Sequence, residues 1–149
     1  LTCSLLRPLL NMNEQVTHAF TAAMSVNLNE RKEAEKYLES LKSQPGFSIV
    51  ILQIIQQNCS NDSQRPLRQI ASIFFKNLVK KRWETDDDSV PSIPEGDKAQ
   101  IKTHLVEMMS NVPPEVQRQL SEALSIIASY DFPAKWEDLL PGLIQKFST

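Results

Sequence analysis

The residues that could carry out covalent or metal chemistry are few and far apart in this chain. Its only histidines are His18 and His104, and its only cysteines are Cys3 and Cys59. A catalytic triad needs a nucleophile, a base and an orienting acid in contact, and a tetrahedral metal site needs four ligands. The spacing supplies neither arrangement, and no glycine-rich phosphate loop is present. We therefore expect a protein that is not an enzyme and holds no metal or cofactor.

A run of three aspartates, Asp86 to Asp88, is the one cluster that suggests a cation site. An EF-hand loop also needs a glycine at its sharp turn and a distal glutamate, and this segment lacks both. Pro91 and Pro94 follow the aspartates, which is typical of a loop. The run is therefore expected to lie in a solvated connection between two elements.

The composition excludes two classes of partner. Lysine and arginine number 16 against 18 acidic residues, so the chain lacks the basic excess with which nucleic-acid binders displace counterions. No segment approaches the roughly 20 apolar residues that span a bilayer. We expect no binding to nucleic acid and no membrane insertion. In the absence of a secretory signal, the expected compartments are the nucleus and the cytoplasm.

Apolar residues recur at helical spacing along almost the whole chain. The strongest stripe is Leu67, Ile70, Ala71, Phe74 and Leu78, which repeats at three and four residues over more than three turns. Prolines and short polar runs separate the periodic segments. We expect no strand and seven helices, over residues 13–26, 28–43, 46–58, 62–83, 96–110, 114–130 and 133–147.

These helices group into pairs over residues 13–43, 46–83 and 96–130, with the first helix of a fourth pair at 133–147. The spacing between pairs is close to the roughly 40–47 residues of HEAT repeats. The predicted fold class is all-α, a right-handed α-α superhelix of HEAT-like pairs. A four-helix bundle is the alternative at this length, but seven short helices with irregular loops would close poorly as a bundle.

The second helix of each pair carries a polar face opposite its apolar stripe. At 100° per residue, Lys76 and Lys80 lie together on one side of the helix over 62–83. If these second helices are neighbours, their polar faces stack into a concave strip of mixed charge that suits a protein ligand. The alternative is that they are ordinary solvated faces. The corresponding residues are Lys32, Lys36 and Glu39 on the helix over 28–43, and Arg118 and Glu122 on the helix over 114–130.

Two segments resemble a known family. Residues 68–83 combine a helix rich in small residues, the pair Lys76-Asn77 and a terminal tryptophan. This segment resembles the N-terminal signature of the importin-β superfamily. Residues 119–128 and the Asp-Phe-Pro-Ala-Lys-Trp segment over 131–136 resemble the exportin branch that returns importin-α to the cytoplasm. The resemblance covers residues 12–149, whereas residues 1–11 do not fit it and are expected to be an unrelated N-terminal extension.

The resemblance implies the N-terminal part of a nuclear export receptor that shuttles between nucleus and cytoplasm. It implies Ran-GTP, the cargo importin-α and nucleoporins as partners. An importin of the same superfamily and a HEAT scaffold without Ran binding remain alternatives. The residues expected to contact Ran are Lys76 and Asn77, which match the family pair, together with Lys80, Lys81, Arg82, Arg118, Glu122, Lys32 and Lys36.

Overall fold

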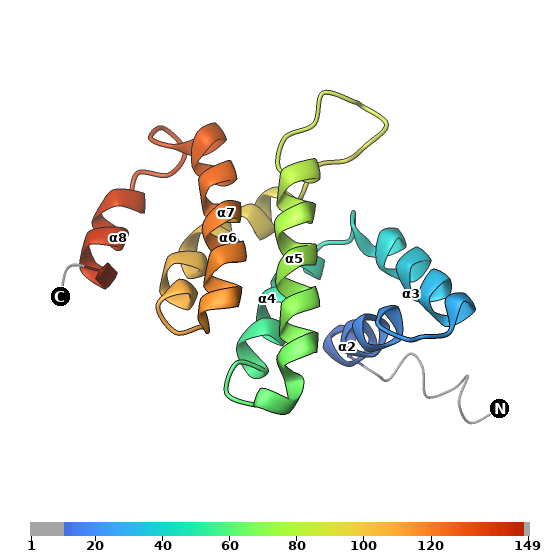
Figure 1. Cartoon of the computed structure of the whole chain (residues 1–149). Helices are drawn as coiled ribbons and strands as arrows, with labels where there is room; N and C mark the ends of the chain where they lie inside the picture. The colour runs from blue at the N-terminus through green and yellow to red at the C-terminus, as the bar shows by residue number, and fades with distance from the viewer. Residues whose placement is uncertain (1–10, 148–149) are drawn as a thin grey trace.

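The computed structural model describes residues 11–147, and all regular structure in that span is helical (Figure 1). The predicted all-α class is confirmed, because residues 11–147 contain no strand. The helices are α2 (Met12–Ala23), α3 (Leu28–Leu41), α4 (Phe47–Gln57), α5 (Arg65–Arg82), α6 (Glu95–Met109), α7 (Pro114–Asp131) and α8 (Leu139–Phe147), with a 3-10 turn η2 (Asp62–Gln64) before α5.

The helices stack as pairs and do not close into a bundle. Helix α2 packs on α3, α4 on α5, and α6 on α7, and successive pairs meet through α2 with α4, α4 with α6, and α5 with α7. In Figure 1, α5 and α7 lie in front of α4 and α6, so the second helices of these pairs form one layer. The sequence predicted a polar strip over all three second helices; α5 and α7 share this layer, whereas α3 packs on α2.

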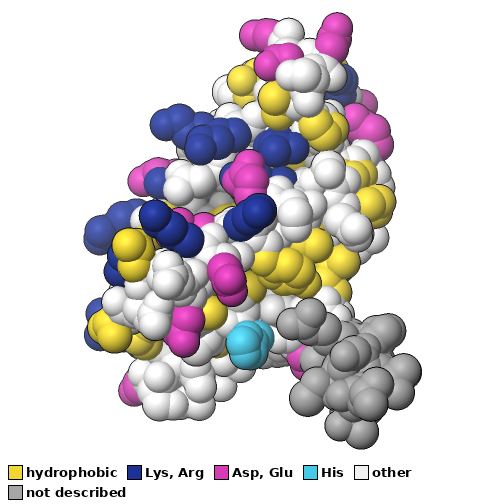
Figure 2. Space-filling view, turned by 90° about the vertical axis from the view of Figure 1, so that its right-hand side faces the viewer, with side chains coloured by type: hydrophobic (Ala, Val, Ile, Leu, Met, Phe, Trp, Pro, Cys, Tyr) yellow, Lys and Arg dark blue, Asp and Glu magenta, His cyan; other side chains and the backbone are white. Residues whose placement is uncertain are grey.

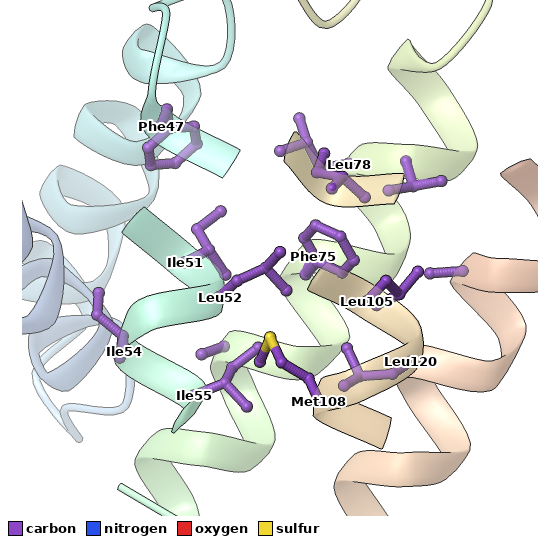
Figure 3. Close-up of a cluster of buried hydrophobic side chains, with 14 of the residues drawn as sticks. Phe47, Ile51, Leu52, Ile54, Ile55, Phe75, Leu78, Leu105, Met108 and Leu120 are labelled. Carbon is purple, nitrogen blue, oxygen red and sulfur yellow. The ribbon is translucent and has the colours of Figure 1, made fainter. Parts of the chain in front are cut away.

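Helix α4 forms the centre of the hydrophobic core. It contacts α2, α5 and α6, and it buries Ile51, Leu52, Ile54 and Ile55 against side chains that include Phe75 (Figure 3). Contact with three helices explains why its sequence is apolar on most sides. Full burial of each such side chain contributes about 1.5–3 kcal/mol, so this helix anchors the layer in front of it.

Asparagine side chains cap the starts of α2 and α3, and a glycine precedes α4. Asn11 accepts the backbone N–H of Glu14 at 2.8 Å, so this last residue of the predicted extension is the N-cap of α2. Residues 1–10 lie outside the described residues. Gly46 precedes α4 with a φ of 87°, a left-handed conformation that favours glycine. Its N–H donates to the carboxylate of Asp97 on α6 at 2.9 Å, which ties the second pair to the third.

The final helix begins later than the sequence predicted. We expected it from residue 133, but residues 132–138 form turns and α8 begins at Leu139. Trp136 is buried in the core within these turns, and the ammonium of Lys102 donates to the carbonyl of Lys135 at 2.9 Å. A regular helix over this segment would have to give up both contacts, because they depend on the turn conformation.

The apolar face of α5 is wider than its predicted stripe. Ile70 and Phe74 of that stripe are only partly buried, whereas Arg68, Phe75 and Val79 are buried. The reason is that α5 is covered from two sides, by α4 and α2 on one side and by α7 on the other. Periodicity in one helix shows its first buried face but not a second one that a later repeat creates.

Candidate protein-binding face

Two of the predicted polar faces lie on α5 and α7, which pack on each other, and the third lies on α3, which packs on α2 and meets the end of α5 through an ion pair. We call the set of charged and polar side chains on these faces the basic strip. In Figure 2, lysine and arginine side chains gather along the left-hand side of the molecule with acidic ones between them. The strip comprises Lys32, Lys36 and Glu39 of α3, Lys76, Asn77, Lys80, Lys81 and Arg82 of α5, and Arg118 and Glu122 of α7.

An ion pair joins α5 to α7 within the strip. The ammonium of Lys76 lies 3.6 Å from a carboxylate oxygen of Glu122. The Lys76 side chain is 22% exposed and that of Glu122 is 55% exposed, so solvent reaches this contact. The structure therefore brings together two predicted site residues that are 46 positions apart in the sequence.

A second ion pair joins α5 to α3. Arg82 lies 3.7 Å from a carboxylate oxygen of Glu39, and it also donates to the carbonyl of Pro91 at 3.3 Å. Only 15% of the Arg82 side chain is exposed, so this predicted residue is largely occupied by the chain itself. Lys42 holds the same Glu39 at 2.7 Å, and that hydrogen bond, with the positive charges of Lys42, Arg82 and Lys81, lowers the pKa of Glu39.

Glu39 was missed as a site residue. The sequence placed it on the polar face of its helix, but that pattern could not show which neighbouring side chain it meets. Its contact with Arg82 depends on where the end of α5 lies relative to α3. The signal that could have found it is a carboxylate on the same face as Lys32 and Lys36, at i+7 and i+3 from them.

The remaining cations of the strip are open to solvent. Lys32, Lys36, Lys80, Lys81 and Arg118 are all exposed. None of the ion pairs formed within residues 11–147 engages any of these five. Together with Lys76 they make this face net positive, and they are placed to contact an acidic ligand.

An exposed apolar side chain lies among these cations. Ile73 is 43% exposed, and it shares one face of α5 with Asn77 and Lys80 because the three are spaced at i, i+4 and i+7. Ile73 is not among the residues predicted to contact a partner, although the same spacing identifies it. The centre of the strip is therefore both apolar and cationic.

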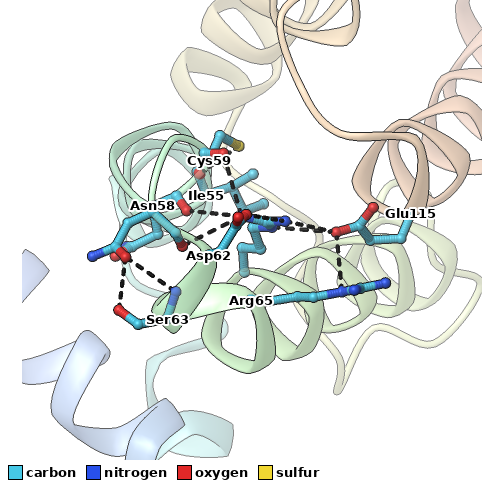
Figure 4. A network of polar contacts seen from close by, with 9 residues as sticks. Ile55, Asn58, Cys59, Asp62, Ser63, Arg65 and Glu115 are labelled. Atoms are coloured by element: carbon cyan, nitrogen blue, oxygen red, sulfur yellow. Dashed lines mark hydrogen bonds and ion pairs between the residues drawn. The ribbon is translucent and has the colours of Figure 1, made fainter.

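A buried network fixes the start of α5 against α7 (Figure 4). The guanidinium of Arg68 donates to a carboxylate oxygen of Glu115 at 2.9 and 3.3 Å. It also donates to three backbone carbonyls within residues 58–61, at 3.3–3.4 Å. Arg65 approaches the same carboxylate oxygen at 3.6 Å from the exposed side. This network could not be predicted from the sequence, because an arginine on a helix normally indicates an exposed position.

A second network fixes the opposite ends of these helices. The indole N–H of Trp83 donates to Asp131 at 3.2 Å, and Lys102 donates to the other oxygen of that carboxylate at 2.9 Å. Trp83 and Asp131 are buried. Because both ends of α5 are hydrogen-bonded to α7, Lys76 and Lys80 are held in place relative to that helix.

The histidines of residues 11–147 do not contribute to a metal-binding cluster. His18 and His104 are both exposed, and no group of three His, Cys, Asp or Glu side chains in that span could hold a metal ion. Burial raises the pKa of the Cys59 thiol, which disfavours the reactive thiolate. In the same span, no helix combines the length and apolar character needed to cross a membrane.

Comparison with known proteins identifies the family. Residues 34–111, more than half of the chain, match the importin-beta N-terminal domain, and the matched span runs from α3 past the end of α6. The chain belongs to the importin-beta N-terminal domain family. The matched span includes Glu39, Lys76, Asn77 and Lys80, whereas helix α7 lies beyond its end.

Exportins are among the relatives of this importin-beta N-terminal domain. It is 35% identical to human Exportin-2 over 119 residues, covering 80% of this chain and 12% of that protein. It is 31% identical to Exportin-2 of Danio rerio over 136 residues, covering 91% of this chain and 14% of that protein. The chain thus spans only about an eighth of the length of these relatives.

A solved structure of an exportin has the same fold. The exportin Cse1 in its cargo-free, cytoplasmic state superposes with a TM-score of 0.76 at 31% sequence identity. The match covers 89% of this chain and 14% of that structure. It confirms the predicted helical solenoid, and it excludes the four-helix bundle that the sequence left as an alternative.

Proposed function

We propose that this chain is the N-terminal part of a nuclear export receptor, which binds Ran-GTP through the basic strip and carries importin-α from the nucleus to the cytoplasm. The observation that carries the proposal is the alignment of open cations over stacked helices in a chain similar to Exportin-2. Such a receptor shuttles between the two compartments and passes nucleoporins on its way.

The chemistry of the strip suits a protein ligand better than a small molecule. Its charged groups are spread over three helices, and an ion pair at such an exposed site contributes only about 0–1 kcal/mol. Useful affinity therefore requires many contacts at once, with a few central residues contributing most of the energy. Long-range attraction by the net positive face would also accelerate association with an acidic surface.

The direct test is binding of fluorescently labelled Ran, loaded with GTP or GDP, to the chain and to Lys76→Glu and Lys80→Glu. We expect the GTP form to bind preferentially, and each charge reversal to weaken it at least about fivefold, which corresponds to ~1 kcal/mol. Lys146→Glu on α8, outside the strip, is the matched control for net charge. Equal binding by the parent and both strip variants would refute the assigned site.

A second measurement separates export from import and from a scaffold. Importin-α is added to the receptor with Ran-GTP, with Ran-GDP or alone, and the complexes are resolved by size-exclusion chromatography. An exportin forms the ternary complex only with Ran-GTP, whereas an importin releases its cargo under that condition. A scaffold without Ran binding would show no difference between the two nucleotide forms.

A further inference from the structure

The two carboxylates of the basic strip differ in how firmly the chain holds them. Glu39 is clamped by Lys42 at 2.7 Å and by Arg82 at 3.7 Å. Glu122 has one ion-pair partner within residues 11–147, Lys76, at 3.6 Å, and its side chain is more than half exposed. An exposed pair at this separation is weak and is exchanged readily with other ions. Glu122 is therefore the carboxylate that a ligand can replace.

The displaced carboxylate has an alternative position on its own helix. Arg118 lies four residues before Glu122 on α7, so the two side chains are neighbours on the helix surface. Arg118 is exposed and takes part in no ion pair among the described residues. Glu122 can therefore turn from Lys76 toward Arg118 without leaving its charge unpaired, which keeps the cost of exchange low.

We propose that Lys76 is a carboxylate-binding subsite that Glu122 occupies in the free chain, and that an acidic side chain of the protein partner displaces Glu122 on binding. The inference rests on the proposed function, since it assigns the partner's chemistry at the same strip. The partner must contact this site with an acidic segment, because the exposed cations Lys80 and Lys81 lie on α5 within five residues of Lys76. Glu122 thus acts as an internal competitor that weakens the interaction.

The test removes the competitor and its subsite separately and together. Glu122→Gln is expected to bind Ran-GTP about twofold to fivefold more tightly than the parent, the range set by the strength of an exposed ion pair. Glu107→Gln, which removes the same charge from a carboxylate paired with Lys146 at 3.9 Å outside the strip, is the matched control and should leave affinity unchanged. In the Lys76→Met background, Glu122→Gln should give no further gain.

Three results would overturn the subsite: weaker binding by Glu122→Gln, a gain equal to that of Glu107→Gln, or a gain that persists in Lys76→Met. A poly-glutamate peptide serves as a second probe at low salt. If the parent fails to bind Ran-GTP but Glu122→Gln binds the peptide more tightly through Lys76, the proposed function fails and the subsite stands. If Ran-GTP binds and neither probe responds to Glu122→Gln, the subsite alone fails. Absence of binding to both probes overturns both proposals.

Discussion

Replacing Arg68 with methionine should destabilise the chain far more than replacing Arg65, although both arginines approach the same oxygen of Glu115. The Arg68 side chain is only 5% exposed, whereas that of Arg65 is 61% exposed. Methionine retains most of the length and volume of the arginine stem, so Arg68→Met removes the guanidinium with little loss of packing. The comparison sets a buried, hydrogen-bonded partner of Glu115 against an exposed partner at longer range.

The magnitude follows from the groups left behind. Arg68 donates to Glu115 at 2.9 and 3.3 Å and to three carbonyls within residues 58–61. Removing one partner of a buried pair costs about 3–5 kcal/mol, because the other groups lose their hydrogen bonds without regaining full hydration. Glu115 is itself partly exposed and keeps Arg65 nearby, so we expect the lower end, about 3 kcal/mol. Arg65→Met should cost less than about 1 kcal/mol.

The assay is urea denaturation of parent, Arg68→Met and Arg65→Met, followed by far-ultraviolet circular dichroism. A loss of about 3 kcal/mol should lower the urea midpoint by roughly 1–3 M, because the free energy of unfolding falls by about 1–3 kcal/mol per molar urea. Combining Arg68→Met with Glu115→Gln should cost less than the sum of the single changes, because the two residues share one interaction. Equal destabilisation by the two arginine substitutions, or simple additivity with Glu115→Gln, would refute the argument from burial.

Three further outcomes follow from the same structure. The pKa of Glu115 is lowered below its ordinary value of 4.5. The largest cause is a hydrogen bond from the backbone of Glu115 itself, and the second is the hydrogen bond from Arg68. The stability it provides is therefore complete above pH 4.5 and is lost as pH falls through the lowered pKa, so the urea midpoints of parent and Glu115→Gln should converge in acid. Trp83→Phe removes the N–H that Asp131 accepts and leaves a void, so it should cost about 2–3 kcal/mol by urea titration; a loss below about 0.5 kcal/mol would contradict the assigned hydrogen bond. Asn27→Ala removes the acceptor for the first N–H groups of α3 and should cost about 1 kcal/mol by thermal melting, whereas an unchanged midpoint would show that the cap contributes nothing.

Much of the architecture could be predicted because each helix carries its own periodic signal. The apolar run of α4 fits a buried strand when taken alone, but its length and its helical neighbours favour a buried helix. The start of α8 could not be predicted, because Pro133 is compatible with a helix start and the preference for turns comes from contacts of Trp136 and Lys135 with other elements.

The binding face could be predicted only in part. Helical spacing placed Lys76, Lys80 and Arg118 on outward faces, and all three lie on the face that the stacked second helices share. It did not show that Arg82 is turned onto Glu39 and Pro91, nor that Glu122 reaches Lys76. Helical periodicity shows which face of a helix a polar side chain is on, but it does not show which residue that side chain contacts. These contact partners lie in other segments of the chain.

The sequence by itself determined which segments are helical, where most of them begin and end, and one buried side of each. These properties depend on residues three and four positions apart, so they are visible in any short window. The tertiary structure alone decided the second buried face of α5 and the partners of Arg68 and Trp83, which lie 47 and 48 residues away. Burial of a charge is stable only where a distant group neutralises it, and only the packing of one helical pair on the next brings such groups together.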